Sequence, residues 1–432
     1  MTLSWDAEQF SLDDQSRFET LNGLWSGKKP PFVTAGVIRN TNFTESGRVD
    51  YSDVAWLQVE QKQLAKRQLK PGDIIVERSG GGPKQPVGRV VYFDREDVPF
   101  SFSNFTSAIR VRDCEAFDSK FVFYGLLELY QSGRTEDIQR HTTGIRNLDF
   151  TAYKKRAAFP QIPLPEQRKI AGVLGVVQRA IEQQERLLQL TAELKKTLLH
   201  QFFTQGLCGE PQKQTEIGPV PESWEERPLE KAGDVVYGIQ AAVASNLKPV
   251  GTMILTNKNI TLDGKIVLEK INYFVLKTKR HHETVLKKGD LLFNWRSGSK
   301  EHVGKTAYFD LAGEFVHSSF ILRIRPGDEV TGRYLFYYLN FLRESGFFLK
   351  KQTFSINAKF NKSAINELPT YLPGEEERRE IVGALDGVGK KLEVLQAKRR
   401  LLEDLFRTLL HQLMTAQIRV HDTPSVDREF VS

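Results

Sequence analysis

Several short stretches contain residues that could do chemistry, but each lacks part of the pattern that the chemistry needs. Gly298–Thr306 resembles a phosphate-binding loop, yet five residues separate its two glycines where that motif has four. The adjacent histidines that begin at His281 lack the spacing of four residues that places two zinc ligands on one helix face. Asp73 and Glu77 could form a paired-carboxylate metal site, but only Asp73 has a counterpart later in the chain, Asp290. The sequence therefore predicts no catalytic residue and no metal ligand.

The tripeptide Arg-Ser-Gly occurs twice, each time shortly after a Gly-Asp pair and a short apolar run. Glycine lets a backbone approach a phosphate closely. Ser hydroxyls and backbone N–H groups can bond phosphate oxygens, and arginine can also read guanine in the major groove. We predict that both segments contact DNA, while a flexible hairpin loop with ordinary surface charge is the alternative. The candidate residues are Arg78, Ser79, Gly80, Gly81, Lys84, Arg296, Ser297, Gly298 and Lys300.

A second polar and basic stretch occurs in each half, upstream of a long helical segment. Both stretches contain Thr beside basic side chains, which suits either DNA contact or simple loop structure. We keep both interpretations for this pair. The candidate residues are Arg140, Thr142, Thr143, Arg146, Lys351, Thr353 and Asn357.

Composition limits the class of protein. The chain has 432 residues, a net charge of +7 and a pI near 9.1, and 40% of its residues are hydrophobic. Several domains with real cores are expected at this length. The excess of Lys and Arg favours a polyanionic partner such as nucleic acid, although a merely soluble basic protein has the same charge. Two cysteines, no amino-terminal signal pattern and no long apolar run predict a cytoplasmic protein.

The elements that must position these residues occur twice. Ile170–His200 aligns without a gap to Ile381–His411, 211 residues later. Shorter matches lie upstream, and repeats fix architecture before any local pattern does. These matches pair Leu69–Val76 with Leu286–Phe293, Val87–Arg89 with Val303–Lys305, and Ile109–Arg112 with Leu322–Arg325. The repeated unit is therefore a globular domain followed by a long helix, and we expect approximate two-fold symmetry.

Each repeated unit has a recognisable internal pattern. Short β-branched runs such as Asp73–Val76 and Ala108–Val111 predict strands, and Lys120–Tyr130 predicts a helix whose counterpart is Tyr334–Leu342. The long segments place apolar residues at coiled-coil spacing, beginning with Ile170 and Leu174. Each long helix would span about 55–60 Å and needs a partner, for which the other copy is the obvious candidate.

Three motifs give the chain a family resemblance. They are Leu-Pro-Glu-Gln-Arg-Lys-Ile at Leu164–Ile170, the stretch Ile217–Trp224, and the Gly-Asp pairs at Gly72 and Gly289. Together with the repeat, they resemble the specificity (S) subunits of type I restriction–modification systems over essentially the whole chain. The first domain shows no counterpart of the tryptophan opening at Trp224.

The resemblance implies an α+β fold in which two β-rich target-recognition domains are joined by two long helices that form an antiparallel coiled coil with pseudo-two-fold symmetry. It implies a non-catalytic subunit whose domains each read half of a bipartite double-stranded DNA site. The adenine-methylation motif is missing, since Lys29 stands where that motif has Asn or Asp. The predicted segments are domain 1 at 1–163, spacer helix 1 at 164–206, a linker at 207–223, domain 2 at 224–371, spacer helix 2 at 372–418 and a tail at 419–432.

The resemblance also implies the partners. Two modification (methyltransferase) subunits would dock on the helices and methylate adenine with S-adenosylmethionine. Restriction subunits would add ATP-driven translocation and cleavage with Mg²⁺. This chain itself is expected to bind no cofactor. The rival interpretation is a coiled-coil scaffold that carries two protein-interaction domains.

Overall fold

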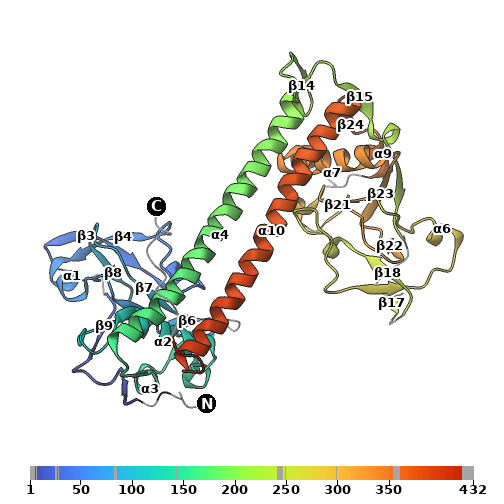
Figure 1. Ribbon diagram of the computed structural model, residues 1–432. Coiled ribbons are helices and arrows are strands. Elements are labelled where there is room, and N and C mark those ends of the chain that lie inside the picture. Colours follow the sequence, from blue (N-terminus) through green and yellow to red (C-terminus); the bar gives the residue numbers. More distant parts are fainter. Residues whose placement is uncertain are drawn as a thin grey trace. The chain divides into compact units, whose positions relative to one another are not determined.

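The chain divides into two compact units in the computed structural model, which describes residues 5, 7–24, 27, 29–81, 85–142, 145–240, 247–248, 250–297, 299–353 and 361–420. Unit 1 consists of residues Met1–Arg186 and Ala397–Ser432, and unit 2 consists of Leu187–Gln396. Figure 1 labels the elements of both. No helix of the described residues is long and apolar enough to cross a membrane.

Unit 1 is built on a four-stranded antiparallel sheet. Its strand order is β2 (Phe18–Asn22), β9 (Thr106–Val111), β5 (Ile74–Glu77) and β7 (Val90–Tyr92). A second sheet has the order β4 (Ala55–Glu60), β3 (Phe32–Ile38) and β8 (Phe100–Phe102), with β3 and β8 parallel. A third has the order β10 (Gln139–Thr142), β11 (Ile145–Leu148) and β6 (Ser79–Gly81). The other elements are the pair β1 (Gln9–Ser11) and β12 (Ala158–Pro160), and helices η1 (Asn40–Asn42), α1 (Gln61–Arg67), α2 (Ser119–Gln131), η2 (Glu136–Ile138) and α3 (Phe150–Arg156).

Unit 2 repeats this plan. Its first sheet has the order β16 (Gly233–Tyr237), β23 (Ile321–Pro326), β20 (Leu291–Asn294) and β21 (Thr306–Tyr308). Its second has the order β17 (Leu247–Lys248), β19 (Asn272–Phe274), β18 (Thr252–Leu255) and β22 (Phe315–His317), with β18 and β22 parallel. The other elements are the pair β15 (Glu225–Pro228) and β24 (Pro369–Leu372), and helices η3 (Leu229–Lys231), η4 (Asn257–Asn259), α6 (Lys279–His282), η5 (Lys300–His302), α7 (Glu329–Glu344), α8 (Phe347–Thr353) and α9 (Lys362–Asn366).

The predicted medium-length helices are confirmed, and each has an acidic cap. Asp118 precedes α2 and its side chain accepts a hydrogen bond from the Phe121 N–H. Asp328 precedes α7 and accepts one from the Thr331 N–H. These caps satisfy N–H groups that a helix start leaves without intrahelical partners. Since both helices are capped the same way, each begins at a defined residue beside the four-stranded sheet of its unit.

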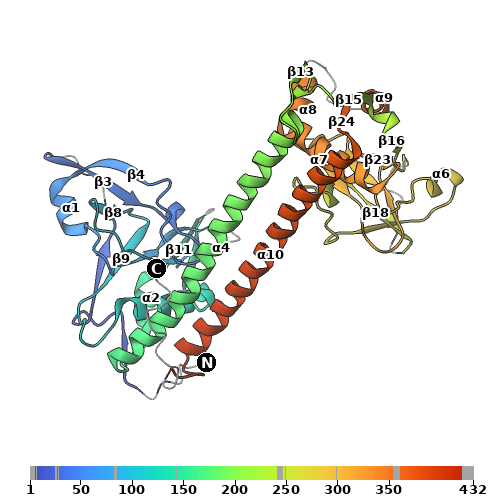
Figure 2. The same ribbon diagram turned by 45° about the horizontal axis from the view of Figure 1, so that its top comes forward.

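The two long helices are confirmed as α4 (Leu164–Gln205) and α10 (Glu375–Met414). In unit 1, the first part of α4 and the last part of α10 run in opposite directions and share one apolar core with α2 (Figures 1 and 2). In unit 2, the last part of α4 and the first part of α10 do the same with α7. The core residues from the long helices include Ile170, Leu174, Ile181, Phe406, Leu410 and Leu413 in unit 1, and Leu199, Phe202, Phe203, Ile381, Val382 and Leu385 in unit 2.

The strand register corrects one of the sequence matches. Ile74 lies opposite Ile109 in unit 1, and its counterpart Leu291 lies opposite Ile324 in unit 2. Ile109 therefore corresponds to Ile324, whereas the sequence match paired it with Leu322. The error is a shift of two residues, and such a shift preserves which side chains face the core, so the apolar pattern alone could not detect it.

The expectation that domain 1 lacks a tryptophan opening is wrong. Trp5 is buried, its indole N–H donates to the Met414 carbonyl at 3.0 Å, and the Arg419 guanidinium lies over its ring. Trp224 is equally buried, and its indole N–H donates to the Glu377 carboxylate at 3.1 Å. Each tryptophan precedes the first strand of its β-rich domain and packs against an end of the long helix α10. The sequence comparison missed Trp5 because little of the surrounding sequence matches.

The predicted linker at 207–223 is partly structured. It contains a β-hairpin formed by β13 (Gln212–Thr215) and β14 (Gly218–Pro221). Val220 of this hairpin belongs to the core of unit 2, and the Leu207 N–H donates to Glu377 at 2.8 Å. The segment after α4 is thus folded onto its own unit.

Candidate nucleic-acid interface

Both candidate segments of domain 1 meet in one small sheet. Strand β6 carries the Arg-Ser-Gly segment and pairs with β11, which pairs with β10 of the second candidate stretch. Asn147 lies opposite both Arg140 and Ser79, so these three side chains share one face of the sheet. The Ser79 hydroxyl hydrogen-bonds to the Asn147 side-chain oxygen at 2.6 Å, and exposed Arg140 pairs with Asp149 at 2.6 Å. The sequence did not predict this pairing, because it reads both segments as loops.

Gly80 has a structural reason to be glycine. Arg146 lies opposite Gly81 and the next residue, Asn147, lies opposite Ser79, so Gly80 forms a bulge in β6. Its φ is +114°, and a Cβ at this position would come within 2.4 Å of the Asn40 side-chain nitrogen. The bulge and this contact account for the glycine whether or not a phosphate approaches the segment.

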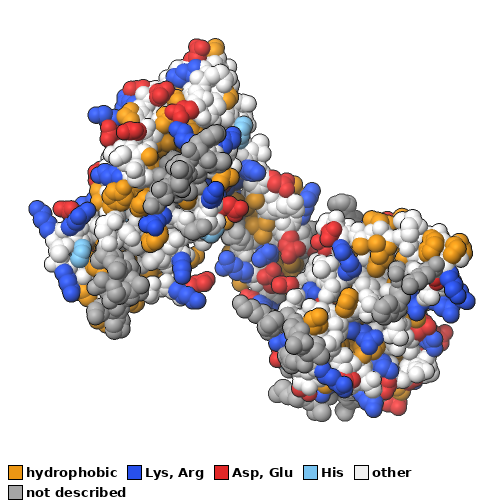
Figure 3. Space-filling model, turned by 180° about the vertical axis from the view of Figure 1, so that it is seen from behind, with side chains coloured by type: hydrophobic (Ala, Val, Ile, Leu, Met, Phe, Trp, Pro, Cys, Tyr) orange, Lys and Arg blue, Asp and Glu red, His pale blue; other side chains and the backbone are white. Residues whose placement is uncertain are grey.

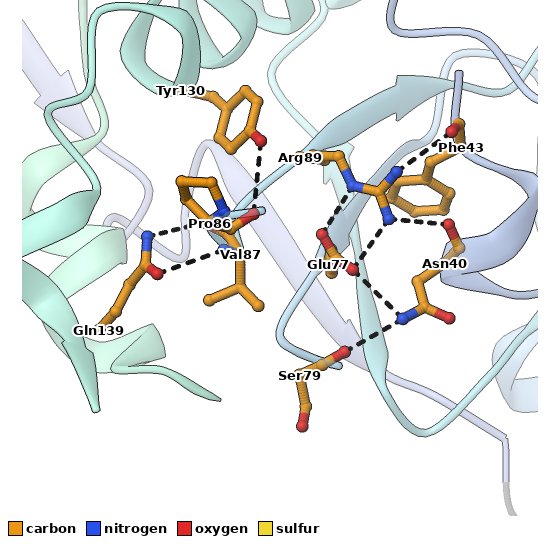
Figure 4. A network of polar contacts seen from close by, with 9 residues as sticks. All are labelled: Asn40, Phe43, Glu77, Ser79, Pro86, Val87, Arg89, Tyr130 and Gln139. Atoms are coloured by element: carbon orange, nitrogen blue, oxygen red, sulfur yellow. Dashed lines mark hydrogen bonds and ion pairs between the residues drawn. The ribbon is translucent and has the colours of Figure 1, made fainter. Parts of the chain in front are cut away.

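A buried ion pair lies next to the Arg-Ser-Gly segment of unit 1 and is linked to it through Asn40 (Figure 4). Glu77 is buried and accepts hydrogen bonds from the Arg89 guanidinium at 2.8 and 2.9 Å. Arg89 also donates to the carbonyl oxygens of Asn40 and Phe43, at 2.9 and 3.2 Å. Asn40 in turn donates to Glu77 and to the Ser79 carbonyl. Burial alone would lower the pKa of Arg89, but the Glu77 hydrogen bond and charge raise it overall. Glu77 therefore has a structural role, in an ion pair with the arginine that holds the η1 turn in place.

Unit 2 holds the equivalent turn with different chemistry. Lys305 takes the place of Arg89 and donates to the carbonyl oxygens of Asn257 and Ile260, at 2.7 and 2.6 Å. Asn294 takes the place of Glu77 and donates to the His302 carbonyl at 2.7 Å. Burial lowers the pKa of Lys305. Lys305, the lysine of the segment that resembles a phosphate-binding loop, thus bonds to main-chain carbonyl groups inside the fold.

The two arginines of the Arg-Ser-Gly segments have different environments. Arg78 is half-buried, donates to Asn22 at 3.0 Å and to Ser107 at 3.3 Å, and lies 4.8 Å from the centre of the Phe150 ring. Burial lowers its pKa. By strand register, the unit 2 residue at this position is Trp295, because unit 2 has one extra residue before its Arg-Ser-Gly. Arg78 therefore packs within unit 1.

Arg296 is in a different situation. It is exposed, and its guanidinium lies 5.4 Å from the centre of the exposed Phe320 ring. Ser297 accepts a hydrogen bond from the Ser299 N–H at 3.3 Å. Among the residues that the structure describes, Arg296 makes none of the side-chain hydrogen bonds that hold Arg78, so it is better placed to contact a ligand.

The described part of the second candidate stretch of unit 2, Lys350–Thr353, is helical, whereas the stretch of unit 1 forms strands β10 and β11. Helix α8 packs against η5, which begins with exposed Lys300. Lys351 of α8 pairs with Glu216 at 2.6 Å. The two candidate segments therefore meet in unit 2 as well, through different secondary structure. Lys84, Thr143, Gly298 and Asn357 lie outside the described residues, as do the side chains of Thr142 and Thr353.

Charge and metal chemistry do not mark out another site. On the face drawn in Figure 3, Lys and Arg side chains are interspersed with Asp and Glu. No group of three or more His, Cys, Asp or Glu side chains that could hold a metal ion occurs in the described part of the chain. His281 packs edge-on against the Phe274 ring, 5.1 Å away. On that face and among the described residues, loop geometry therefore defines the candidate interface more than a charged patch does.

One feature beside both Arg-Ser-Gly segments was not predicted from the sequence. Tight turns at Ser103–Thr106 and Ser318–Ile321 precede equivalent strands, and each carries an exposed phenylalanine, Phe105 or Phe320. The signal was present as a repeated Ser-x-Phe, but the surrounding sequences differ too much for it to stand out.

Comparison with known sequences gives a consistent result. Residues 221–404 match the family described as Type I restriction modification DNA specificity domain. The chain is 30% identical over 222 residues to a putative type I restriction enzyme MjaX specificity subunit of Methanocaldococcus jannaschii, covering 48% of this chain and 50% of that protein. It is 23% identical over 321 residues to the MjaVIII specificity subunit of the same organism, covering 70% and 71%. The chain thus spans about half the length of the first of these relatives.

Solved structures share the fold. The S subunit of a type I restriction–modification system from M. genitalium aligns with a TM-score of 0.57 at 15% identity, covering 96% of this chain and 98% of that one. A chain from a structure described as the basis of complex assembly and conformational transition of the type I R-M system aligns with a TM-score of 0.55 at 18% identity, covering 93% and 98%. The two β-rich domains and two long helices are therefore a known arrangement of elements.

Proposed function

We propose that the chain is a DNA specificity subunit of a type I restriction–modification system, which recognises a bipartite DNA sequence and catalyses nothing itself. Each domain would read one half-site. The observation that carries the proposal is the doubling of one sheet topology, with candidate loops that differ between the copies. Two copies of one scaffold that carry different loops are suited to recognising two different DNA sequences.

Base readout would come from the small sheet of unit 1 and the η5–α8 region of unit 2. Arg140 and Arg296 are exposed cations at these places, and Lys300 is a third. Arginine can pair with guanine through two hydrogen bonds, whereas phosphate contacts set position and carry no sequence information. The net charge of +7 favours the approach of any nucleic acid and cannot by itself select a sequence.

The long helices offer surfaces for the modification subunits. Leu190 and Leu194 of α4 are 44% and 50% exposed, although they are large apolar side chains. Leu401 and Leu405 of α10 lie 211 residues later and are 69% and 45% exposed. The pairs are four residues apart, so each forms a local apolar stripe on its helix. Two equivalent stripes support the docking of two equivalent modification subunits.

The expected division of labour follows from this proposal. The modification subunits would bind S-adenosylmethionine and transfer the methyl group to adenine. Restriction subunits would use ATP and Mg²⁺ for translocation and cleavage. This chain would supply the sequence preference and hold the partners together.

The test is to purify the chain alone and with candidate modification subunits, and to compare binding to a DNA library. We expect tight, sequence-specific binding and adenine methylation by the assembled complex only, at sites with two specific halves and a nonspecific spacer. Methyl transfer by the chain alone would contradict the non-catalytic assignment. Specific protein partners without any DNA binding by the assembly would favour the rival scaffold function.

A further inference from the structure

The turns that carry Phe105 and Phe320 are built alike. The Thr106 N–H donates to the Ser103 carbonyl at 3.0 Å, and the Ile321 N–H donates to the Ser318 carbonyl at 3.0 Å. Thr106 lies opposite Glu77, and Ile321 lies opposite Asn294, which occupies the same place in its sheet. Each phenylalanine is therefore the third residue of the same turn in its own unit.

The rings are exposed although they belong to large apolar side chains. Phe105 is 48% exposed and Phe320 is 39% exposed. Single exposed apolar residues are common on protein surfaces and need no explanation. Here the same residue type is exposed at the same position of a duplicated fold, in two units whose surrounding loops differ. That recurrence calls for a function common to both units.

Each phenylalanine lies beside an Arg-Ser-Gly segment. The N–H groups of Arg78 and Ser79 donate to the Phe105 carbonyl, at 2.8 and 3.2 Å. In unit 2 the Arg296 guanidinium lies 5.4 Å from the centre of the Phe320 ring. In unit 1 the contact with the fold is made by the main chain of the turn, which any residue could supply. Little of the fold therefore depends on the exposed part of the ring.

We propose that Phe105 and Phe320 each contact the bases of the half-site read by their own unit, through an apolar base surface. This inference rests on the proposed DNA-recognition function and adds the aromatic residues to the basic ones. Two base features have this chemistry. The C5-methyl group of thymine is an apolar contact in the major groove, and the face of an unstacked base accepts an aromatic ring.

The experiment uses the complex of the full chain with modification subunits and measures dissociation constants by fluorescence anisotropy. We expect Phe105→Ala to weaken binding to cognate DNA roughly 5- to 150-fold, the range found for losing one aromatic–base contact. Phe105→Leu keeps an apolar side chain and should lose less affinity. Binding by this variant shows that a substitution at position 105 does not prevent folding. Sequence preference should relax in one half-site only, and Phe320→Ala should relax it in the other. The slope of affinity against salt should not change, because no charge is removed.

Phe32→Ala is the matched control, since Phe32 is 45% exposed in the same unit but lies on strand β3. It should leave affinity and half-site preference unchanged. Replacing thymine by deoxyuridine reveals a methyl contact if the wild-type complex loses affinity and the alanine variant does not. Replacing adenine by 2-aminopurine reveals an unstacked base if its fluorescence rises on binding of wild type only. Either response supports the proposal.

Three results would overturn it. In the first, the wild-type complex binds DNA specifically, and the alanine variants bind it with the same affinity and the same sequence preference. The DNA-recognition function would then stand, but the phenylalanines would have no part in it. An equal loss in Phe32→Ala would show that exposed aromatic area in general is responsible, which also contradicts the assignment. A wild-type complex without specific DNA binding would instead refute the proposed function, and this inference with it.

Discussion

Glu77 and Asn294 occupy the same position, yet one is charged and the other is neutral. In unit 1 the carboxylate balances Arg89, which in turn holds two carbonyl oxygens of the η1 turn. In unit 2 the amide accompanies Lys305, which holds the equivalent carbonyl oxygens. The pairs Glu–Arg and Asn–Lys are thus two solutions to one structural problem, and each side chain is matched to its neighbour.

This matching makes a prediction about coupling. Glu77→Asn alone leaves the buried Arg89 charge without its carboxylate, and breaking a buried pair usually costs about 3–5 kcal/mol. Adding Arg89→Lys should recover at least about 1 kcal/mol relative to the sum of the two single changes. Urea denaturation of the four proteins measures the coupling. The control cycle is Arg95→Lys with Asp97→Asn, an exposed pair that should show almost none. Additive losses at positions 77 and 89 would contradict the matching.

His317 predicts a pH dependence. Burial lowers its pKa to about 3, against 6.5 for a free histidine, and its ring lies 3.2 Å from the Ile321 carbonyl. Between these values the unfolded chain binds the proton and the folded chain does not, so stability falls as the pH drops below 6.5. Lowering the pH from 7 to 5 should cost about 2 kcal/mol through this residue.

His317→Asn keeps a donor for the carbonyl but does not titrate. The stability difference between pH 7 and pH 5, measured by urea denaturation, should shrink by about 2 kcal/mol in this variant. His282→Asn is the control, because His282 lies in α6 and is not buried. An unchanged difference in His317→Asn would mean that the ring gains its proton within the folded chain.

At the scale of elements, one face of each long helix packs in the core of a unit, and another face carries exposed apolar side chains. The residues at coiled-coil spacing, such as Ile170 and Ile381, are buried within their units. The recurring leucines Leu190, Leu194, Leu401 and Leu405 lie off this seam and stay exposed. A helix that only joined its own partner would need no second apolar stripe.

The exposed stripes predict the effect of adding charge. Leu194→Glu should remove one modification subunit from the complex, and Leu405→Glu should remove the other, because each would bury a charge in an apolar interface. Native mass spectrometry counts the subunits that remain. Ala192→Glu is the matched control, since it lies about 200° around α4 from Leu194 and is exposed. Full assembly of both leucine variants would place the docking surface elsewhere.

At the scale of the molecule, duplication predicts modular specificity. Replacing residues 1–160 with a foreign target-recognition domain should change one half of the methylated site and leave the other half unchanged. The reason is that each unit has its own sheets, core and candidate loops. Sequencing of methylated DNA from cells that express the chimeric complex measures the outcome. A change in both halves would show that the units read DNA jointly.

Helix length predicts the spacer between the half-sites. The end of α4 is a poor place for an insertion, because Phe202 and Phe203 are in the core of unit 2 and Leu207 bonds to Glu377. One heptad inserted after Arg186, with another after Gln396, lengthens both helices by about 10 Å and keeps their apolar phase. That corresponds to about three base pairs of DNA.

We expect the methylated sites of this double-insertion variant to keep both half-sites with a longer spacer, or methylation to be lost because one unit is rotated around the duplex. A heptad in α4 alone is the control, since it mismatches the helices and should abolish methylation. Both half-sites with an unchanged spacer in the double-insertion variant would show that the helices do not set the distance.

The sequence by itself determined the duplication, the strands β5, β7 and β9, the helices α2 and α7, and the two long helices. These features depend on local composition and on the spacing of apolar residues, and both can be read directly from the order of residues in the chain. The candidate DNA contacts at Arg78–Gly81 and Arg296–Lys300 also came from the sequence, and they stay predictions. The proposed contacts themselves remain predictions at Arg140, Arg296 and Lys300.

Only the tertiary structure decided which residues correspond and which side chains are used inside the fold. It moved the partner of Ile109 to Ile324, since a two-residue slip leaves the apolar pattern unchanged. It assigned Arg78 to packing and left Arg296 exposed, and it brought Ser79 beside Asn147 across 68 residues of sequence. Such contacts join segments far apart in the chain, and their energies depend on register and burial. Neither quantity is present in a linear pattern of residue types.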